Sequence, residues 1–157
     1  DLIDQLGGSQ IKVTALQCHT TPVLDDHACG TLTSFLDEHV KACATSEALD
    51  LRLSLTAQEL TQLIGSAAFK AVSTIFQEPF DTIRLRRVEA APNGNQFIYF
   101  HTDYSKRTMQ IALNGYEEYD GGRLVFLTTN GFVQPVRPRG SATIHDDSIL
   151  HGVSVLT

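Results

Sequence analysis

Residues 96–104 read QFIYFHTDY, and this stretch decides how the second half of the chain is expected to fold. Aromatic and β-branched residues dominate it, which favours a β-strand. Because successive side chains on a strand point to opposite faces, His101 and Asp103 are predicted to point the same way. The same alternation places Phe97 and Tyr99 beside them. We therefore expect this face to line an interior that binds a ligand.

An imidazole and a carboxylate on one face of a strand can bind the same metal ion, and His151 offers a second imidazole. Two histidines and one carboxylate occupy a single face of a non-haem Fe(II) ion and leave other positions open, whereas a structural zinc site uses all four of its positions. His101, Asp103 and His151 are therefore the candidate metal ligands and catalytic residues. An isolated pair of this kind is more often a hydrogen-bonded histidine beside a turn residue, so the hypothesis depends on the surrounding sequence.

The surrounding sequence is a series of short strand-like segments that runs from Asp81 to the last residue. Turns rich in Gly, Pro and Asn separate the segments at Pro92–Asn95, Asp120–Gly122 and Arg137–Gly140. Many short strands with such turns indicate an all-β barrel or jelly roll. The expected strands are residues 81–88, 96–104, 108–114, 123–127, 132–136 and 141–145, and a final segment from Ile149 that contains His151.

Five features follow one another in a fixed order in this half of the chain. They are His101-x-Asp103, the segment Thr108–Asn114 that ends in Leu-Asn, the Gly-Gly turn in Asp120–Leu124, the Pro-x-Gly-x-Ala turn Pro138–Ala142, and the histidine in Leu150–Val153. In this order they resemble the 2-oxoglutarate- and Fe(II)-dependent dioxygenases, and within them the prolyl 4-hydroxylase-like branch. The resemblance implies a mainly β fold with N-terminal α-helices, a double-stranded β-helix (jelly roll or cupin-like) barrel.

The resemblance also implies a reaction. His101, Asp103 and His151 would hold Fe(II), with 2-oxoglutarate and O2 as co-substrates and succinate and CO2 as products. The expected activity is hydroxylation of a C–H bond on a protein or peptide side chain such as proline, although a small-molecule substrate fits the fold equally. Halogenating relatives have a small residue at the position of Asp103, so hydroxylation is the expected outcome.

Some relatives have tyrosines that contact 2-oxoglutarate at two positions where this chain has Ala91 and Ala112, so these contacts do not carry over to this chain. Tyr99, Thr108 and Gln110 are the candidate cofactor-binding residues, since strand alternation puts each of them on the presumed inner face. Ordinary packing in the barrel is the alternative for all three.

Three further residues are candidate substrate contacts near the expected open end of the barrel: Arg107, Arg123 and His145. The two arginines would attract an acidic or carboxylate-bearing substrate, and Tyr116–Tyr119 is a candidate rim. We expect His145 to lie on the rim as well. His151 is preferred as the distal ligand because the Leu-His-Gly-Val pattern falls there.

In this family an Arg or Lys about ten positions after the distal histidine pairs with the far carboxylate of 2-oxoglutarate. Only six residues follow His151 in this sequence. A carboxylate in a partly dry site needs a charge-assisted partner, so we expect the natural chain to continue beyond Thr157 with such a residue and with the last barrel strand. The alternative is a catalytically weak or inactive metal-binding interaction module of the same fold.

The first half of the chain is expected to be helical. Apolar residues recur at helical spacing over Asp26–Ala44 and Thr56–Phe76, and Thr56 with Glu59 forms a candidate capping box. Residues 44–55 are expected to connect the helices. We predict a single domain over residues 1–157, in which residues 1–80 form a helical support outside a barrel core of residues 81–157.

Length and composition agree with one soluble domain: 157 residues, 42% hydrophobic and 19% charged. The net charge of −6 disfavours binding to a phosphate backbone. The cluster Arg84, Arg86 and Arg87 keeps a nucleic-acid demethylase of the same superfamily as a minor alternative, although a solvated or ion-paired face explains it more simply.

The remaining features bear on compartment. Apolar runs are far shorter than the roughly 18 residues of a transmembrane helix, and the N-terminus lacks the pattern of a secretory signal, so no membrane partner is expected. Cys18, Cys29 and Cys43 are too few for a disulfide framework, which favours the cytoplasm. His19, His27 and His39 are expected to be structural or exposed, and the sequence leaves the oligomeric state open.

Overall fold

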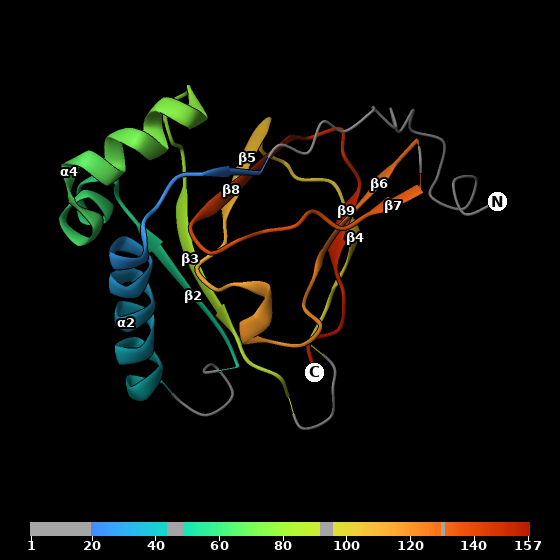
Figure 1. Ribbon diagram of the computed structural model, residues 1–157, viewed down its shortest axis with the longest axis horizontal. Helices are drawn as coiled ribbons and strands as arrows, with labels where there is room; N and C mark the ends of the chain where they lie inside the picture. The colour runs from blue at the N-terminus through green and yellow to red at the C-terminus, as the bar shows by residue number, and fades with distance from the viewer. Residues whose placement is uncertain (1–19, 44–48, 92–95, 130) are drawn as a thin grey trace.

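The computed structural model describes residues 20–43, 49–91, 96–129 and 131–157. Within these residues the protein is mostly β, with nine strands in antiparallel sheets and two α-helices (Figure 1). The helices are α2 (Asp26–Ala42) and α4 (Ala57–Phe76), and a short 3-10 helix covers Tyr116–Glu118. The strands are β1 (Thr20–Pro22), β2 (Asp50–Leu55), β3 (Ile83–Val88), β4 (Ile98–His101), β5 (Arg107–Ile111), β6 (Leu124–Thr128), β7 (Gly131–Val133), β8 (Ser141–Asp146) and β9 (His151–Val153).

Both predicted helices form, and their first residues are capped by side chains. The Asp25 carboxylate accepts a 2.8 Å hydrogen bond from the backbone N–H of Ala28 at the start of α2. The capping box of α4 is confirmed, because the Thr56 hydroxyl accepts from the Glu59 N–H and the Glu59 carboxylate accepts from the Thr56 N–H. Helix α4 is kinked at Gly65, whose φ of 83° lies outside the helical region and is accessible because glycine has no Cβ.

The sequence predicted a connector over residues 44–55, and this prediction is wrong for residues 50–55. Asp50–Leu55 forms β2, which pairs with β3 in antiparallel register from Asp50↔Val88 to Leu55↔Ile83. The alternation of Leu51, Leu53 and Leu55 with polar residues is the period of a strand with one buried face. Residues 1–80, which were predicted to form a helical support, therefore contain strands as well: β2 pairs with β3, and β1 pairs antiparallel with β8. Residues 44–48, including the expected end of the first helix, lie outside the described residues.

The main core lies between the two helices and one face of the β2–β3 pair. Figure 1 shows α2 and α4 on one side of these strands and the other sheets on the opposite side. The buried members of this core include Cys29, Leu32, Leu36, Leu51, Val72 and Leu85. Cys29 and Cys43 have free thiols, and Cys18 lies outside the described residues. The helices thus cover one face of the pair and leave its other face to the rest of the molecule.

The remaining strands form two antiparallel sheets. One has the order β1-β8-β5 and the other the order β4-β9-β6-β7. A small apolar cluster of Leu124, Phe126 and Ile149 is buried at the second sheet. The expected turns at Asp120–Gly122 and Arg137–Gly140 contain glycines with positive φ, and the turn at Pro92–Asn95 falls outside the described residues. Among the described helices, none has the length and apolar character needed to cross a membrane.

Candidate metal centre

His101, Asp103 and His151 come together where β4 pairs with β9. His101 and His151 are register partners, and their ring centroids lie 4.5 Å apart. Nε2 of His101 lies 3.6 Å from Oδ1 of Asp103, and Nε2 of His151 lies 3.7 Å from the same oxygen. One ligand atom from each residue falls within 4.8 Å of the other two, so the group could hold a metal ion.

The backbone brings these residues together by a route that strand alternation does not predict. Strand β4 ends at His101, and Asp103 lies beyond it. The register passes from Ile98↔Val153 to His101↔His151, so β4 contains one more residue than β9 over this interval, which is a β-bulge. A bulge reverses the alternation, and the side chain of Tyr99 is consequently 78% exposed.

Gly152, on β9, lies against the bulge in β4. A Cβ at this position would stand 2.8 Å from the carbonyl oxygen of Ile98 and 3.3 Å from the backbone nitrogen of Phe100. Such a contact with backbone atoms is too short for any residue other than glycine. The close approach of β4 and β9, on which the pairing of the two histidines depends, therefore requires glycine next to His151.

Backbone carbonyls orient the imidazoles of this region. Nδ1–H of His101 donates to the Tyr99 carbonyl over 2.8 Å, and Nδ1–H of His151 donates to the Ile149 carbonyl over 3.2 Å. In a neutral imidazole this leaves a lone pair on Nε2, the atom that faces Asp103. Hydrogen bonds of this kind are typical of metal-binding histidines. The two rings are therefore held in the tautomer that metal binding needs.

Burial reinforces the neutral state of His151. Its side chain is only 4% exposed, and burial lowers its pKa below the ordinary value, although the hydrogen bond to the Ile149 carbonyl raises it in part. A neutral imidazole can donate its lone pair to a metal ion without first losing a proton. His101 and Asp103 are 43% and 23% exposed, so the group is closed on the side of His151 and open on the side of His101.

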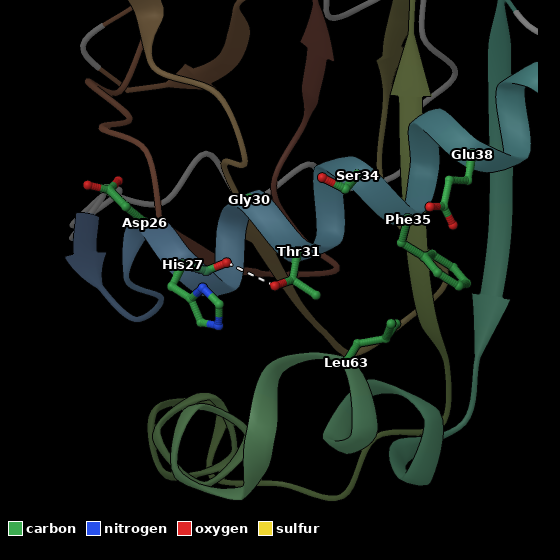
Figure 2. A pocket seen from close by; sticks show the side chains of 8 residues that line it. All are labelled: Asp26, His27, Gly30, Thr31, Ser34, Phe35, Glu38 and Leu63. Atoms are coloured by element: carbon green, nitrogen blue, oxygen red, sulfur yellow. Dashed lines mark hydrogen bonds between the residues drawn. The ribbon is translucent and has the colours of Figure 1, made fainter.

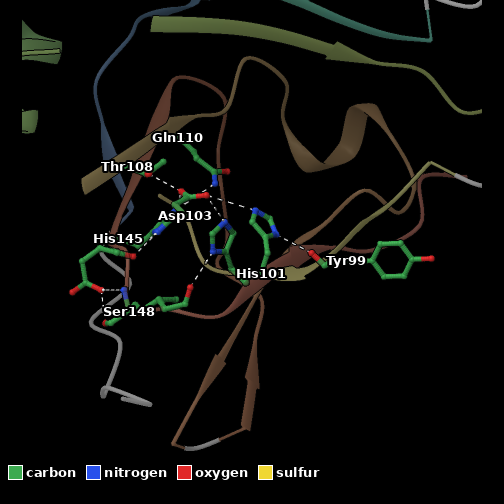
Figure 3. A network of polar contacts seen from close by, with 10 residues as sticks. Tyr99, His101, Asp103, Thr108, Gln110, His145 and Ser148 are labelled. Atoms are coloured by element: carbon green, nitrogen blue, oxygen red, sulfur yellow. Dashed lines mark hydrogen bonds and ion pairs between the residues drawn. The ribbon is translucent and has the colours of Figure 1, made fainter. Parts of the chain in front are cut away.

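A hydroxyl fixes the carboxylate of the third ligand. The Thr108 hydroxyl on β5 donates a 2.6 Å hydrogen bond to Oδ2 of Asp103 (Figure 3). Because Oδ2 is engaged in this way, Oδ1 is the oxygen that faces the two Nε2 atoms. The sequence predicted Thr108 as a cofactor contact, and the structure places its hydroxyl against Oδ2 of Asp103, where it orients this candidate ligand.

His145 does not lie on a rim, and that prediction is wrong. Its side chain is fully buried, with Nε2 3.7 Å from Oδ2 of Asp103 and 3.5 Å from the amide nitrogen of Gln110. Its ring packs 4.4 Å from that of His151 and 5.5 Å from that of Phe126. Strand β8 buries Ser141, Ala142 and Thr143 as well as His145, and the polar Ser141, Thr143 and His145 alternate with the apolar Ala142 and Ile144, so no local pattern in the sequence indicates that His145 is buried.

The other predicted contacts fall in different places. Tyr99 was expected on the inner face, but its ring points away from the centre (Figure 3), because the bulge intervenes. Gln110 does approach the centre through His145. Arg123 donates to the carbonyls of Tyr116 and Tyr119 and lies over both rings at 4.2 and 4.5 Å, so its guanidinium is held by the expected rim segment.

Arg107 lies on β5 at the edge of the helical layer, where its guanidinium is 5.8 Å from the centroid of the Phe76 ring on α4. His27 and His39 belong to α2, and His39 donates to the Phe35 carbonyl, as suits structural histidines. His19 lies outside the described residues. The structure therefore brings the three predicted residues into a group that could hold a metal ion. It places both candidate substrate arginines over aromatic rings: Arg107 over Phe76, and Arg123 over Tyr116 and Tyr119.

The described residues form a surface hollow of about 570 Å³ between the helices, which is lined by α2 residues from Asp26 to Glu38 and by Leu63 of α4 (Figure 2). None of its lining residues belongs to the metal-binding group. Another hollow, of about 480 Å³, contains His101 in its wall and therefore adjoins the group.

No protein-family model matches this chain, and no curated protein matches it.

Proposed function

We propose that the protein is an Fe(II)- and 2-oxoglutarate-dependent dioxygenase, similar to the prolyl 4-hydroxylase-like branch, that hydroxylates a C–H bond. A protein or peptide side chain such as proline is the proposed substrate. The observation that carries the proposal is that His101, Asp103 and His151 each offer one ligand atom and that these atoms lie within 4.8 Å of one another.

The chemistry of these donors fits Fe(II). Two imidazole nitrogens and one carboxylate oxygen are the ligand set of non-haem Fe(II) oxygenases, which leaves positions open on the metal. Both imidazoles have their Nδ1–H groups bonded to backbone carbonyls, so their lone pairs face the common centre. When bound, Fe(II) with 2-oxoglutarate and O2 would supply the oxidising power for hydroxylation, with release of succinate and CO2.

The protein's own residues would orient the ligands and control access. Thr108 and the two backbone carbonyls fix the three ligand side chains before any metal binds. His145 and Phe126 are buried beside His151 and exclude water from that side. The exposed side of His101 is then the side from which a substrate would approach.

A double-stranded β-helix is the fold that we propose for the strands around this centre. Successive strands change sheets in a way that supports it: β4 belongs to one sheet, β5 to the other, β6 and β7 to the first, β8 to the second and β9 to the first. Alternation between two antiparallel sheets is typical of jelly rolls. It brings β4 and β9, which carry two of the ligands, side by side.

The proposal is tested by anaerobic titration of the full-length protein with Fe(II) and 2-oxoglutarate, followed by measurement of succinate and CO2 after O2 is admitted. We expect one Fe(II) per chain and turnover that depends on the metal. His101→Ala and Asp103→Ala should abolish both Fe(II) binding and turnover. Candidate peptides are then screened by mass spectrometry for a gain of one oxygen.

His39→Ala is the matched control, because it removes an imidazole from α2 without touching the centre. Unchanged turnover in both ligand variants would reject the assigned centre. Stoichiometric metal binding without decarboxylation would reject the enzyme and favour the metal-binding interaction module.

A further inference from the structure

The groove next to the metal-binding group has two unlike walls. Its volume is about 480 Å³, within the range of roughly 300–1,000 Å³ that small-molecule sites occupy. The β2–β3 wall consists of Asp50, Arg52, Arg84 and Arg86. The wall from β4 and the residues before it comprises Gln96, Phe97, Ile98, Tyr99 and His101.

The arginines face the groove because of strand alternation. Arg52 is the register partner of Arg86, and Arg84 stands two residues away on the same face of β3. The intervening residues Leu51 and Leu85 belong to the opposite face and are buried against the helices. The hydrophobic core thus fixes which way the three guanidinium groups point.

Positive charge in the groove exceeds the negative charge. Asp50 accepts hydrogen bonds from Arg86 at 2.7 and 3.0 Å and from Arg52 at 2.5 Å. Burial alone would raise the pKa of Asp50, but the hydrogen bonds from Arg86 and Arg52 outweigh it and lower the pKa to about 2. Three guanidinium groups against one carboxylate leave two positive charges in excess, in a chain whose net charge is −6.

Arg84 is the arginine of this wall that remains available. Its side chain is exposed, and within the part of the chain that the structure describes it forms no ion pair. The arrangement around Asp50 shows that this wall already binds one carboxylate with forked guanidinium geometry. The guanidinium group of Arg84 could therefore pair with the carboxylate of a bound molecule.

The facing wall offers an apolar surface. Phe97 and Tyr99 form an edge-to-face pair with ring centroids 4.7 Å apart, and the two residues are 40% and 78% exposed. Exposed aromatic side chains that line a hollow favour a ligand with an apolar part. The bulge that turns Tyr99 away from the metal-binding group is what places it here.

We propose that this groove binds a small organic carboxylate whose charged end pairs with Arg84 and whose apolar part packs on Phe97 and Tyr99. His101 forms part of the groove and is the more exposed of the two histidine ligands, so the bound molecule reaches the open side of the metal-binding group. As an assignment of substrate or co-substrate class, this inference rests on the proposed function. The anion site itself does not require a metal.

The test is calorimetric titration of the metal-free full chain with 3-phenylpropionate and with its uncharged amide. The acid should bind about tenfold more tightly than the amide, since only the acid can form a charge-assisted pair. Arg84→Gln should remove most of this preference and leave amide binding unchanged. Tyr99→Ala should weaken both ligands.

Arg87→Gln is the matched control. Arg87 is the next residue of β3, points to the opposite face and pairs with Asp37 and Glu89, so its replacement changes the net charge equally outside the groove. Equal affinities for acid and amide, or an equal loss in Arg84→Gln and Arg87→Gln, would overturn the inference. Inorganic phosphate that binds as tightly as the acid would overturn the assignment to a carboxylate.

A competition experiment identifies the source of the carboxylate. With Fe(II) bound and O2 excluded, displacement of 3-phenylpropionate by 2-oxoglutarate identifies the groove as the co-substrate site, and simultaneous binding identifies it as the substrate site. Both outcomes support the anion site. If the wild-type protein binds the acid but shows no decarboxylation, the proposed function alone is rejected. If the wild-type protein shows no preference for the acid over the amide, this inference alone is rejected.

Discussion

The hydroxyl of Thr108 holds Oδ2 of Asp103 at 2.6 Å and thereby determines that Oδ1 faces His101 and His151. Thr108 belongs to β5 and Asp103 to the segment after β4, so the hydrogen bond also ties the carboxylate to a different sheet from the one that carries the histidines. A carboxylate without this bond could rotate about its terminal torsion, which is broad. The orientation of the third ligand is thus a property of two sheets together.

Replacement of Thr108 should weaken metal binding. Thr108→Val keeps the side-chain shape but removes the donor, and loss of such a partner typically costs 10- to 100-fold in metal affinity. We expect about a tenfold weaker Co(II) affinity, measured by absorbance titration. Thr61→Val on α4 is the control, because its hydroxyl donates only to the Ala57 carbonyl. Equal Co(II) affinities in wild type and Thr108→Val would contradict the role given to this hydroxyl.

His145 should behave as a neighbour of the metal-binding group rather than as a member of it. His145→Phe keeps an aromatic ring against Phe126 and removes both ring nitrogens. We expect one Co(II) per chain and less than a tenfold change in affinity, whereas His151→Ala should lose stoichiometric binding. If His145→Phe also loses it, a Gln variant, which restores a polar atom, distinguishes a ligand from a packing defect. Loss of binding in both His145 variants, with the fold intact, would show that His145 is itself a ligand.

Gly152 should be intolerant of a methyl group. Gly152→Ala would place Cβ 2.8 Å from the Ile98 carbonyl oxygen, so β4 must shift. We expect a loss of about 1–3 kcal/mol in unfolding free energy, measured with urea, together with weaker metal binding because His101 moves. Gly30→Ala is the control: its nearest contact is 3.8 Å, it lies in α2, and it should stabilise the protein by about 0.5–1 kcal/mol. Wild-type stability in Gly152→Ala would show that the two strands are not in close contact.

The Asp50 ion pairs should stabilise the protein in a pH-dependent manner. The folded state lowers the pKa of Asp50 from its ordinary 3.8 to about 2, so the stabilisation is present above the higher value and is lost as the pH falls toward the lower one. Asp50→Asn should therefore cost about 1 kcal/mol near neutral pH, after allowance for solvent screening, and less near pH 2.5. Urea unfolding of both proteins at the two pH values measures this difference. A gap that does not narrow in acid would exclude ionisation of Asp50 as its source.

Local sequence determined several elements. The Thr56 and Glu59 capping box and the helical periodicity of both apolar stripes predicted α2 and α4, because caps and helical faces depend on residues within a few positions of one another. Turns marked by Gly and Pro likewise predicted most strand positions after residue 81. The alternation in β2 was equally local and could have been used, since Leu51, Leu53 and Leu55 carry the period of a strand.

By itself, the sequence determined which residue types can bind a metal: two histidines and an aspartate of suitable chemistry at positions 101, 103 and 151. Only the tertiary structure decided how they meet. The bulge in β4 depends on pairing with β9. The orientation of the Asp103 carboxylate depends on the hydrogen bond from Thr108 of β5, and the position of His145 depends on β8. The arginine-lined groove has the same origin, since its two walls come from strands that no local pattern relates. Alternation is set by a residue's immediate neighbours, whereas register and bulges are set by the best packing of segments far apart in the chain.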